Sequence, residues 1–398
     1  MRKVTKALSA ALVLALTVSG LAACGGTDSG TSNGSSSQGG SEGNTATAFK
    51  LGGIGPLTGD AAIYGNAAMR GAQIAVDEIN ALGGDIQFEF QSEDDVHDAE
   101  TSVNAYNTLV DWGMQILVGT VTTTPCIAVS SETYSDRIFE ITPSASSTDV
   151  IDGKDNVFQV CFTDPNQGKA SAQYISENYA GKKVGIIYKN DDAYSQGIHD
   201  MFITTAKELG VEYVECGTFT NDTSTDFSVQ VTAAKDAGCD IVFLPMYYQP
   251  ASSIFAEANK QGYEPIWFGV DGMDGILTMD GFDTSLAEGV LLLTPFSADA
   301  EDESTQNFVA TYQDKYGETP NQFAADGYDA VYVVYAAIQK AGVTADMSAE
   351  DICEALIPVM TEISVDGLTG TGMTWDSTGA VSKEPRAVVI KDGVYVTP

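Results

Sequence analysis

Hydroxyl side chains gather after two neighbouring apolar segments of this sequence. Threonines follow the segment 116–118 and serines follow the segment 138–141, at positions that include Thr123, Ser144 and Ser146. Proline is favoured in the first turn of a helix and a preceding threonine is a good N-cap, so a helix is predicted to begin near Pro125. Hydroxyl groups beside the free N–H groups of a helix start can hold a small anion such as a carboxylate. The alternative is that these residues only cap helices.

The elements that would position these side chains alternate along the chain. Apolar, β-branched segments predicted as strands, such as 49–54 and 240–244, alternate with segments of helical spacing, such as 66–80. This alternation predicts parallel sheets, whose strands end at one edge where ligands bind. The order of strand, polar loop, tyrosine, helix and glycine occurs at Tyr64 and again at Tyr194. The sequence therefore predicts two similar α/β units.

Composition and motifs exclude several classes of function. The 398 residues are enough for two domains, and the net charge of -36 argues against a nucleic-acid partner. Only two histidines are present, which excludes a multi-histidine metal site, and no cofactor is expected. The glycines after the first strand match neither a phosphate-binding loop nor a dinucleotide fingerprint, and no G-x-S-x-G elbow joins a strand to a helix. An enzyme is therefore not expected.

The N-terminus has the pattern of a bacterial export signal. Basic residues precede an apolar stretch over 7–18 that is too short for a typical membrane span. The run Leu21-Ala22-Ala23-Cys24 resembles a lipobox, which implies a signal peptide over 1–23 and lipidation of Cys24. The residues of 24–47 are mostly Gly, Ser, Thr and Asn and are expected to form a flexible tether, as in a Gram-positive lipoprotein. An uncleaved anchor and a non-lipidated signal peptide are the alternatives.

Five cysteines follow Cys24, and none of them has the spacing of a zinc or redox motif. A disulfide between Cys126 and Cys161 is one possibility in an oxidising compartment. Buried free thiols are the other.

Several strand exits together carry a family resemblance. In chain order they are Gly55-Pro56-Leu57-Thr58-Gly59, Tyr64-Gly65, the run 75–80 (Ala-Val-Asp-Glu-Ile-Asn), Ile141-Thr142-Pro143, Thr369-Gly370 and Thr374-Trp375-Asp376. Over about 49–398 the chain resembles the leucine/isoleucine/valine-binding proteins of branched-chain amino-acid ABC transporters. The resemblance implies an α/β fold of two Rossmann-like lobes, with parallel sheets flanked by helices, three hinge crossings and ligand in the inter-lobe cleft. The N-terminal lobe would comprise 48–162 and 295–386, and the C-terminal lobe 163–294 and 387–398.

The resemblance also implies a binding site. The ligand α-carboxylate would be held by Thr123 and Ser146, and its ammonium by the Ser144 carbonyl, the Ser146 hydroxyl and Asp271. Four aromatic residues would wall the side-chain pocket, namely Tyr64, Tyr194, Tyr247 and Phe323. The chain departs from the family pattern where Asp271 replaces a longer glutamate, and where His97 and Thr122 stand at positions that carry paired cysteines in some members.

The implied function is solute capture outside the cytoplasm. The protein would be a monomer, held to the membrane by its lipid, that binds an amino acid, branched-chain above all, by hinge closure. It would deliver this ligand to an ABC permease with its ATPase subunits. The alternatives on the same fold are an aliphatic amide, urea or small aromatic acid as ligand, or a ligand-sensing role.

Overall fold

The first of two β-sheets is entirely parallel. The computed structural model describes residues 48–398. The first sheet has the strand order β2-β1-β3-β4-β5, and all its neighbouring strands pair in parallel. Its strands are β1 (Phe49–Gly55), β2 (Phe88–Asp94), β3 (Ile116–Val118), β4 (Phe139–Thr142) and β5 (Val157–Gln159). The residues of the central strands β3 and β4 are all buried, as expected for a parallel sheet that helices cover on both faces. All five carboxyl ends therefore meet at one edge.

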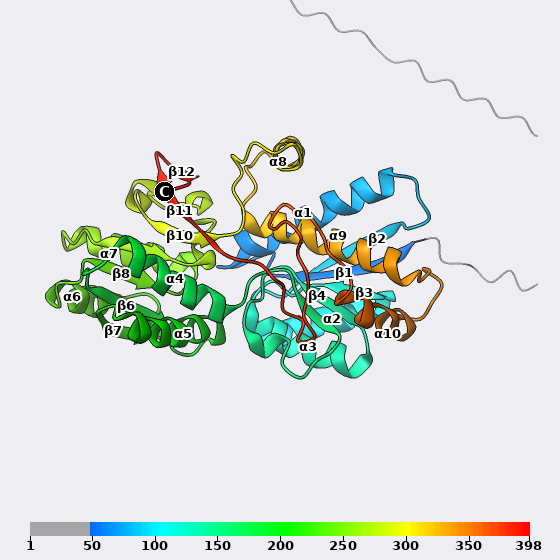
Figure 1. Cartoon of the computed structure of the whole chain (residues 1–398), viewed down its shortest axis with the longest axis horizontal. Coiled ribbons are helices and arrows are strands. Elements are labelled where there is room, and N and C mark those ends of the chain that lie inside the picture. The colour runs from blue at the N-terminus through cyan, green and yellow to red at the C-terminus, as the bar shows by residue number, and fades with distance from the viewer. Residues whose placement is uncertain (1–47) are drawn as a thin grey trace, which may run out of the picture. The chain divides into compact units, whose positions relative to one another are not determined.

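Helices from two distant parts of the sequence cover this sheet (Figure 1). They are α1 (Ala62–Ala81), α2 (Ala99–Trp112), α3 (Thr123–Asp136), α9 (Gln322–Ala341) and α10 (Ala349–Met360). Local signals set their ends: the Asp98 carboxylate accepts a hydrogen bond from the Thr101 N–H at the start of α2, and Gly113 ends that helix with a φ of 92°. Helix α8 (Glu303–Tyr316) lies between the second sheet and α9 in the sequence.

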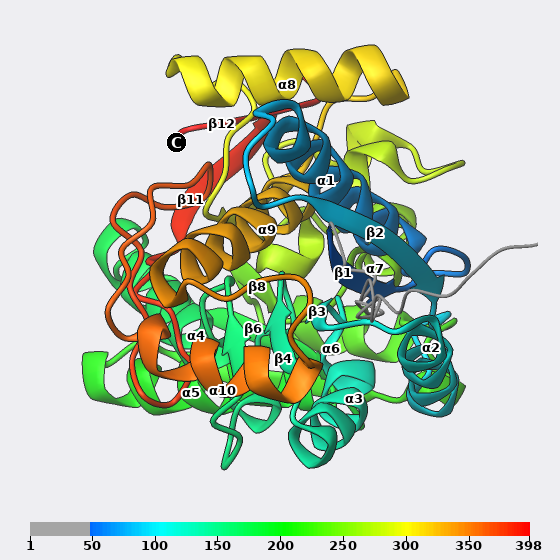
Figure 2. The ribbon, with the colours of Figure 1, turned by 90° about the vertical axis from the view of Figure 1, so that its right-hand side faces the viewer.

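Helices α1 and α9 run side by side, and Figure 2 shows this pair from the right of Figure 1. Glycines make the contact possible, because a Cβ at Gly71 would lie 1.8 Å from the Ala324 carbonyl oxygen. A Cβ at Gly327 would likewise lie 2.1 Å from the carbonyl oxygen of Ala68. This close packing brings the beginning of α9 against α1, where the predicted ligand-binding aromatic residues stand.

The second sheet is mixed and has seven strands in the order β12-β11-β10-β9-β8-β6-β7. The parallel part consists of β6 (Val184–Lys189), β7 (Tyr213–Phe219), β8 (Ile241–Leu244), β9 (Ile266–Gly269) and β10 (Leu291–Thr294). The antiparallel pair β11 (Arg386–Lys391) and β12 (Val394–Val396) is added beside β10. The helices of this half are α4 (Asp164–Asn178), α5 (Ala193–Leu209), α6 (Ser228–Asp236) and α7 (Tyr248–Lys260).

A buried ion pair ties the segment before β11 to α9. The Lys383 ammonium lies 3.1 Å from Asp326 Oδ1 and also donates to the Thr369 hydroxyl, and both charged residues are almost fully buried. Burial raises the pKa of Asp326 to about 6, although the neighbouring Lys383 opposes this rise. Removing either partner alone would leave a buried charge uncompensated.

The predicted α/β architecture with parallel sheets is confirmed. Two helix starts were predicted too late: α1 begins at Ala62 rather than near residue 66, and Tyr194, which was predicted to precede a helix, already lies within α5. Helix α10 was not predicted. The five cysteines after Cys24 are all free and buried, so the possible Cys126–Cys161 disulfide is not formed. The predicted signal peptide, lipidation site and tether lie outside the described residues.

Candidate functional site

The predicted hydroxyl cluster forms at the carboxyl edge of the first sheet. Because β3 and β4 are parallel neighbours, the loops that follow them lie side by side. The Ser144 hydroxyl donates to the Val121 carbonyl oxygen at 2.5 Å, which joins the two loops. Thr123 is the first residue of α3 and Ser146 is fully buried in the second loop. The start of α3 and the serine-containing loop therefore lie side by side at this edge of the sheet.

Aromatic rings from four different elements enclose a small cavity beside this cluster. Tyr64 comes from α1, Phe323 from α9, Tyr194 from α5, and Tyr247 precedes α7. The rings of Tyr194 and Tyr247 stack with centroids 4.7 Å apart, and those of Tyr64 and Phe323 lie 4.6 Å apart. The cavity measures about 10 Å³ and is also lined by Asp271 and Ser144. Six of the eight predicted ligand-binding residues thus line one cavity, whereas Thr123 and Ser146 do not.

Asp271 is the charged group of this cavity and follows β9. Its Oδ1 accepts a hydrogen bond from the Tyr194 hydroxyl at 2.5 Å and one from the Gly272 N–H at 2.7 Å. The Tyr64 hydroxyl donates to the Gly272 carbonyl oxygen at 2.5 Å, so α1 and the second sheet's loop are joined here. Burial raises the pKa of Asp271 to about 6, although these hydrogen bonds oppose the rise. No Lys or Arg within 48–398 forms an ion pair with this carboxylate.

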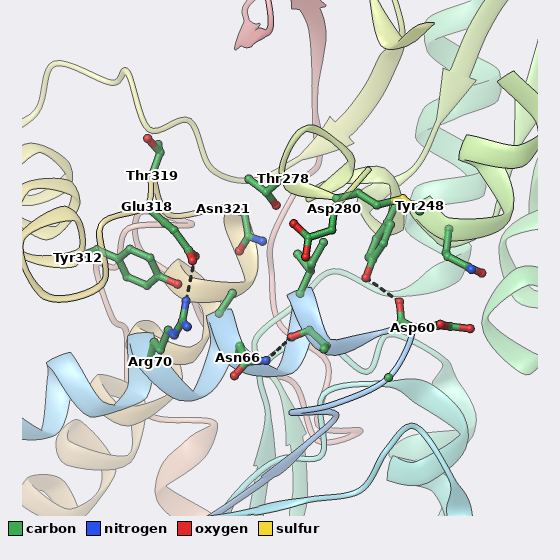
Figure 3. Close-up of a pocket in the computed structure, with 16 residues that line it drawn as sticks. Asp60, Asn66, Arg70, Tyr248, Thr278, Asp280, Tyr312, Glu318, Thr319 and Asn321 are labelled. Carbon is green, nitrogen blue, oxygen red and sulfur yellow. Dashed lines mark hydrogen bonds and ion pairs between the residues drawn. The ribbon is translucent and has the colours of Figure 1, made fainter. Parts of the chain in front are cut away.

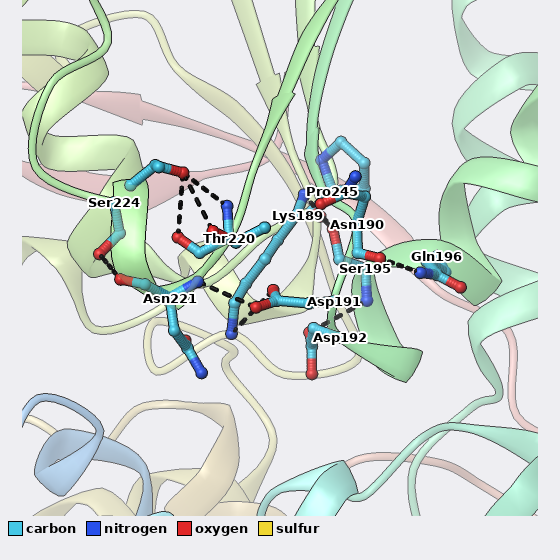
Figure 4. Close-up of polar contacts among 11 residues, drawn as sticks. Lys189, Asn190, Asp191, Asp192, Ser195, Gln196, Thr220, Asn221, Ser224 and Pro245 are labelled. Carbon is cyan, nitrogen blue, oxygen red and sulfur yellow. Dashed lines mark hydrogen bonds and ion pairs between the residues drawn. The ribbon is translucent and has the colours of Figure 1, made fainter.

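Figure 4 shows polar contacts at the start of α5, next to Tyr194 in the sequence. The Ser195 hydroxyl donates to the Pro245 carbonyl oxygen at 2.5 Å and accepts from the Lys189 N–H at 2.9 Å. Asp192 caps α5 by accepting from the Ser195 N–H. The start of α5 is therefore tied to the ends of β6 and β8, and the tyrosine ring has a defined position.

Tyr247 occupies the space next to the helix start that was predicted to hold an anion. Burial and nearby Asp192 raise the pKa of Tyr247 well above its ordinary value, and the approach of the Thr123 N–H partly offsets this rise. The Tyr247 ring also packs edge-on against the His97 ring, with the two ring centroids 5.6 Å apart. A volume of about 10 Å³ is about that of one water site, so a larger molecule fits here only if the surrounding residues move.

Some residues beside the site were not identified from the sequence. Asp164 begins α4 and is fully buried, and neither of its carboxylate oxygens has a hydrogen-bond partner among the described residues. Burial raises the pKa of Asp164 well above its ordinary value, which the adjacent Ser146 hydroxyl opposes only in part. Gln167 accepts a hydrogen bond from the Asp271 N–H at 3.1 Å. The sequence signal that could have identified Asp164 is its position at the end of an extended segment, directly before a proline.

A larger, open pocket of about 470 Å³ lies next to the aromatic cavity and contains none of the predicted site residues (Figure 3). Its lining is polar: Arg70 pairs with Glu318 at 2.8 Å, and the Tyr248 hydroxyl donates to the Asp60 carbonyl oxygen at 2.6 Å. These two contacts join α1 to the segment before α9 and the start of α7 to the loop before α1.

Residues 48–398, which the structure describes, lack two kinds of feature. No helix in this range has the length and apolar character needed to cross a bilayer. The same residues contain no group of three or more His, Cys, Asp or Glu side chains arranged to hold a metal ion.

Comparisons with known proteins place the chain in a family. The family model for periplasmic binding proteins matches residues 48–393. A relative from Brucella melitensis, named Leu/Ile/Val-binding protein homolog 3, is 30% identical over 339 residues, which cover 83% of this chain and 88% of that protein. Proteins of this family bind solutes and are not enzymes.

Solved structures agree with this assignment. The branched-chain amino acid transporter substrate-binding protein LivJ of Streptococcus pneumoniae, solved with isoleucine, is 28% identical and has a TM-score of 0.78 over 88% of this chain and 100% of its own. A solute-binding protein of an ABC transporter from R. palustris, solved with benzoate, is 20% identical, covers 88% of this chain and 95% of its own, and has a TM-score of 0.76, which shows the shared fold. The chain therefore belongs to the periplasmic binding protein family and is a homologue of the Leu/Ile/Val-binding substrate-binding proteins of ABC transporters.

Proposed function

We propose that this chain captures an amino acid with a branched aliphatic side chain outside the cytoplasm and delivers it to an ABC permease with its ATPase subunits. The observation that carries the proposal is the buried Asp271 carboxylate, which lies opposite the hydroxyl cluster of the first sheet and inside a ring of aromatic side chains. A zwitterion needs groups that bind its carboxylate, groups that bind its ammonium and an apolar wall. Asp271, Ser144 and the four aromatic rings line one cavity, and Thr123 and Ser146 belong to the two loops beside it, which supports the proposal.

Each predicted residue has a role in this proposal. The α-carboxylate binds to the hydroxyls of Thr123 and Ser146 and to the N–H groups at the start of α3, after Tyr247 has moved away from that helix end. The ammonium binds Asp271, the Ser144 carbonyl and the Ser146 hydroxyl. The ligand side chain packs against Tyr64, Tyr194, Tyr247 and Phe323, of which the stacked pair of tyrosines belongs to the second half.

The mechanism is capture by closure. We assign 48–162 and 295–386 to one lobe and 163–294 and 387–398 to the other, and the protein acts as a monomer. A ligand that contacts both lobes binds the closed state more tightly and therefore shifts the population toward it. The hydrogen bond that the Tyr64 hydroxyl donates to the Gly272 carbonyl oxygen joins the two proposed lobes and supports a closed arrangement. The permease would recognise this closed state.

A thermal-shift experiment on the mature chain carrying Cys24→Ser tests the ligand. Leucine, isoleucine or valine is expected to stabilise the fold by about 2.7 kcal/mol at a hundredfold excess over its Kd. The matched controls are 4-methylpentanoate, which lacks the ammonium, and 3-methylbutylamine, which lacks the carboxylate, and both should stabilise far less. Equal stabilisation by 4-methylpentanoate and leucine would contradict the role of Asp271.

A small aromatic acid is the second candidate ligand, because four aromatic rings surround the cavity. The buried carboxylates of Asp271 and Asp164 oppose it, since neither has a cationic partner that could offset a further negative charge. Stabilisation by benzoate but not by leucine would favour this ligand over the amino acid.

We also propose that Cys24 carries a lipid that holds the protein on the outer face of the membrane, as in Gram-positive cells. The proposal rests on the lipobox-like run that ends at Cys24. Growth with an alkyne-labelled fatty acid should label the protein, and Cys24→Ala should abolish the label and release the chain into the medium. Equal labelling of the two chains would place the lipid elsewhere.

A further inference from the structure

The turn between β2 and α2 holds a histidine that packs against the wall of the aromatic cavity without lining it. Val96 and His97 are consecutive residues with left-handed backbones, at φ values of 46° and 61°, which are uncommon for residues other than glycine. Two carboxylates hold this turn: Asp94 Oδ1 accepts from the Val96 N–H at 3.0 Å, and Asp95 Oδ1 accepts from the His97 N–H at 2.9 Å. The His97 ring therefore starts from a fixed backbone.

A hydrogen bond ties this ring to the start of α3. His97 Nδ1 lies 2.9 Å from Thr122 Oγ1. Thr122 is only 3% exposed, lines the aromatic cavity and stands at the N-cap position of α3. Its hydroxyl makes no capping hydrogen bond to the helix within the described residues, so this hydroxyl is free to bond to the histidine.

The His97 ring also packs against the second half of the chain. It meets the Tyr247 ring at an interplanar angle of 83°, with centroids 5.6 Å apart. Tyr194 stacks on Tyr247 at 4.7 Å, and the Tyr64 ring lies 5.4 Å from it. Three rings thus pack around Tyr247, and His97 is the one that does not line the cavity. Burial lowers the pKa of His97 to about 4, so the ring is uncharged at neutral pH and packs as an ordinary aromatic ring.

The position of Tyr247 limits the space in the cavity. Its ring forms part of the wall around a volume of about 10 Å³. A side chain in a packed interior keeps its place through contacts with its neighbours, so the loss of one neighbouring ring gives Tyr247 room to turn away from the cavity. A larger ligand side chain could then enter.

We propose that His97 is a positioning residue that sets the size of the ligand side chain by holding Tyr247 against the cavity when the lobes are closed. The inference rests on the amino-acid site proposed above and extends it, because it names the residue that excludes side chains larger than leucine. Thr122 takes part by fixing the orientation of the histidine ring.

Isothermal titration calorimetry of the mature chain carrying Cys24→Ser tests this role with leucine and phenylalanine. His97→Asn removes most of the ring, while asparagine tolerates the left-handed backbone and keeps a polar group for the Thr122 hydroxyl. Leucine affinity should fall about three- to tenfold, which is the worth of one aromatic pair. Phenylalanine affinity should rise, so the ratio of the two affinities should shift about tenfold or more toward phenylalanine.

Two further variants separate positioning from a general effect on the fold. Thr122→Val removes the hydrogen bond but leaves the histidine ring, and it should shift the ratio in the same direction by a smaller factor. Thr122→Ser keeps the hydroxyl and should return most of the selectivity. The matched control is Val96→Asn, which changes a residue 45% exposed in the same left-handed turn and should keep the ratio of the parent chain.

A double-variant comparison shows whether His97 acts through Tyr247. In a chain that already carries Tyr247→Leu, adding His97→Asn should leave the affinity ratio unchanged. A further shift in that background would overturn the proposal, and so would equal ratios for His97→Asn and the parent chain. If His97→Asn fails to fold, an unchanged ratio in Thr122→Val would overturn it.

Failure of the proposed function gives a different result. A parent chain that binds benzoate and not leucine would contradict the amino-acid ligand, and the affinity ratio of benzoate to 2-naphthoate would then decide the role of His97 with the same variants. A parent chain that binds neither class of compound would contradict both proposals.

Discussion

Asp271→Asn is expected to weaken the binding of leucine by about 2–5 kcal/mol, because it leaves the buried ammonium of the ligand without its charged partner. The change is nearly isosteric. The asparagine carbonyl can still accept from the Tyr194 hydroxyl and the Gly272 N–H, which now bond to Asp271 Oδ1. The loss should therefore come from charge and not from a collapsed cavity. Isothermal titration calorimetry of the mature chain measures it directly.

The matched control for this variant is Asp192→Asn. Asp192 lies close to Tyr247 and is almost fully buried, so the control removes one negative charge from the same neighbourhood. Asparagine caps helices as well as aspartate does, and α5 should keep its start. The control is expected to lose much less affinity than Asp271→Asn. Equal losses in the two variants would show that general negative potential, and no specific contact, attracts the ligand.

The pH dependence gives a second measurement of the same contact. The pKa of Asp271 without ligand is about 6, and only the ionised form pairs with an ammonium group. Leucine affinity should therefore fall as the pH drops below 6, approaching about tenfold per pH unit, and Asp271→Asn should lack this part of the fall. Burial, together with Lys189, lowers the pKa of His97 to about 4, so protonation of this buried ring also opposes the folded arrangement in acid. The parent chain and the Asp271→Asn variant share the contribution of His97. The difference between their curves of leucine affinity against pH therefore reports the titration of Asp271.

Much of the fold could be predicted because local signals and tertiary structure agree. Strands such as Ile116–Val118 are short, apolar and bounded by glycine, and the alternation with helices leaves a parallel sheet as the simplest arrangement. Helix α10 was missed because Pro358 interrupts its pattern. Its apolar face, which includes Leu356, is buried against the first sheet, so tertiary packing supports this helix despite the proline.

The late helix starts have one physical cause. Gly65 and Gly197 resemble loop residues in the sequence, yet both lie within helices. A Cβ at Gly65 would lie 2.0 Å from the Pro56 carbonyl oxygen, and one at Gly197 would lie 3.1 Å from Cβ of Asp164. These glycines allow a neighbouring segment to approach a helix closely. Such an approach depends on how the folded segments pack, so the local pattern did not reveal it.

The site was predictable to the extent that it depends on strand ends. Tyr247 and Asp271 follow two neighbouring parallel strands of the second sheet, and the topology alone brings them to the same edge. The positions of Asp164 and Gln167 beside Asp271 depend instead on how α4 packs after the chain leaves β5. The small volume of the cavity was not predictable either. It depends on the position of Tyr247 near the Thr123 N–H, which results from side-chain packing between the two halves.

The largest expected effect on stability comes from a residue outside the site, Glu140 on β4. Its side chain is fully buried, and Thr133 Oγ1 lies 2.5 Å from one carboxyl oxygen while Cys126 Sγ lies 3.3 Å from the other. Burial raises the pKa of Glu140 from its ordinary value of 4.5 to about 8, against the effect of both hydrogen bonds. The folded protein therefore carries this group protonated at neutral pH.

The sign of the pH effect follows from the raised pKa. The stabilising contribution is fully present below about pH 4.5 and is lost as the pH rises through 8, because the unfolded chain ionises first. Raising this pKa from 4.5 to about 8 corresponds to roughly 5 kcal/mol of unfolding free energy. Between these limits Glu140 alone should lower the stability by about 1.4 kcal/mol per pH unit.

Glu140→Gln is expected to remove this dependence. Glutamine keeps the size of the side chain, can accept from the Cys126 thiol, and can donate to the Thr133 hydroxyl, which still donates to the Ser130 carbonyl oxygen. Urea denaturation from about pH 5 to pH 9 should show the variant gaining several kcal/mol over the parent chain at the alkaline end. Glu132→Gln, an exposed change on the neighbouring helix, is the control and should follow the parent at every pH. Asp95, Asp271 and Asp326 are other buried carboxylates with raised pKa values, and all three chains contain them, so their contribution to the pH dependence is the same in each. Parallel curves for Glu140→Gln and the parent would therefore mean that burying Glu140 carries no such cost.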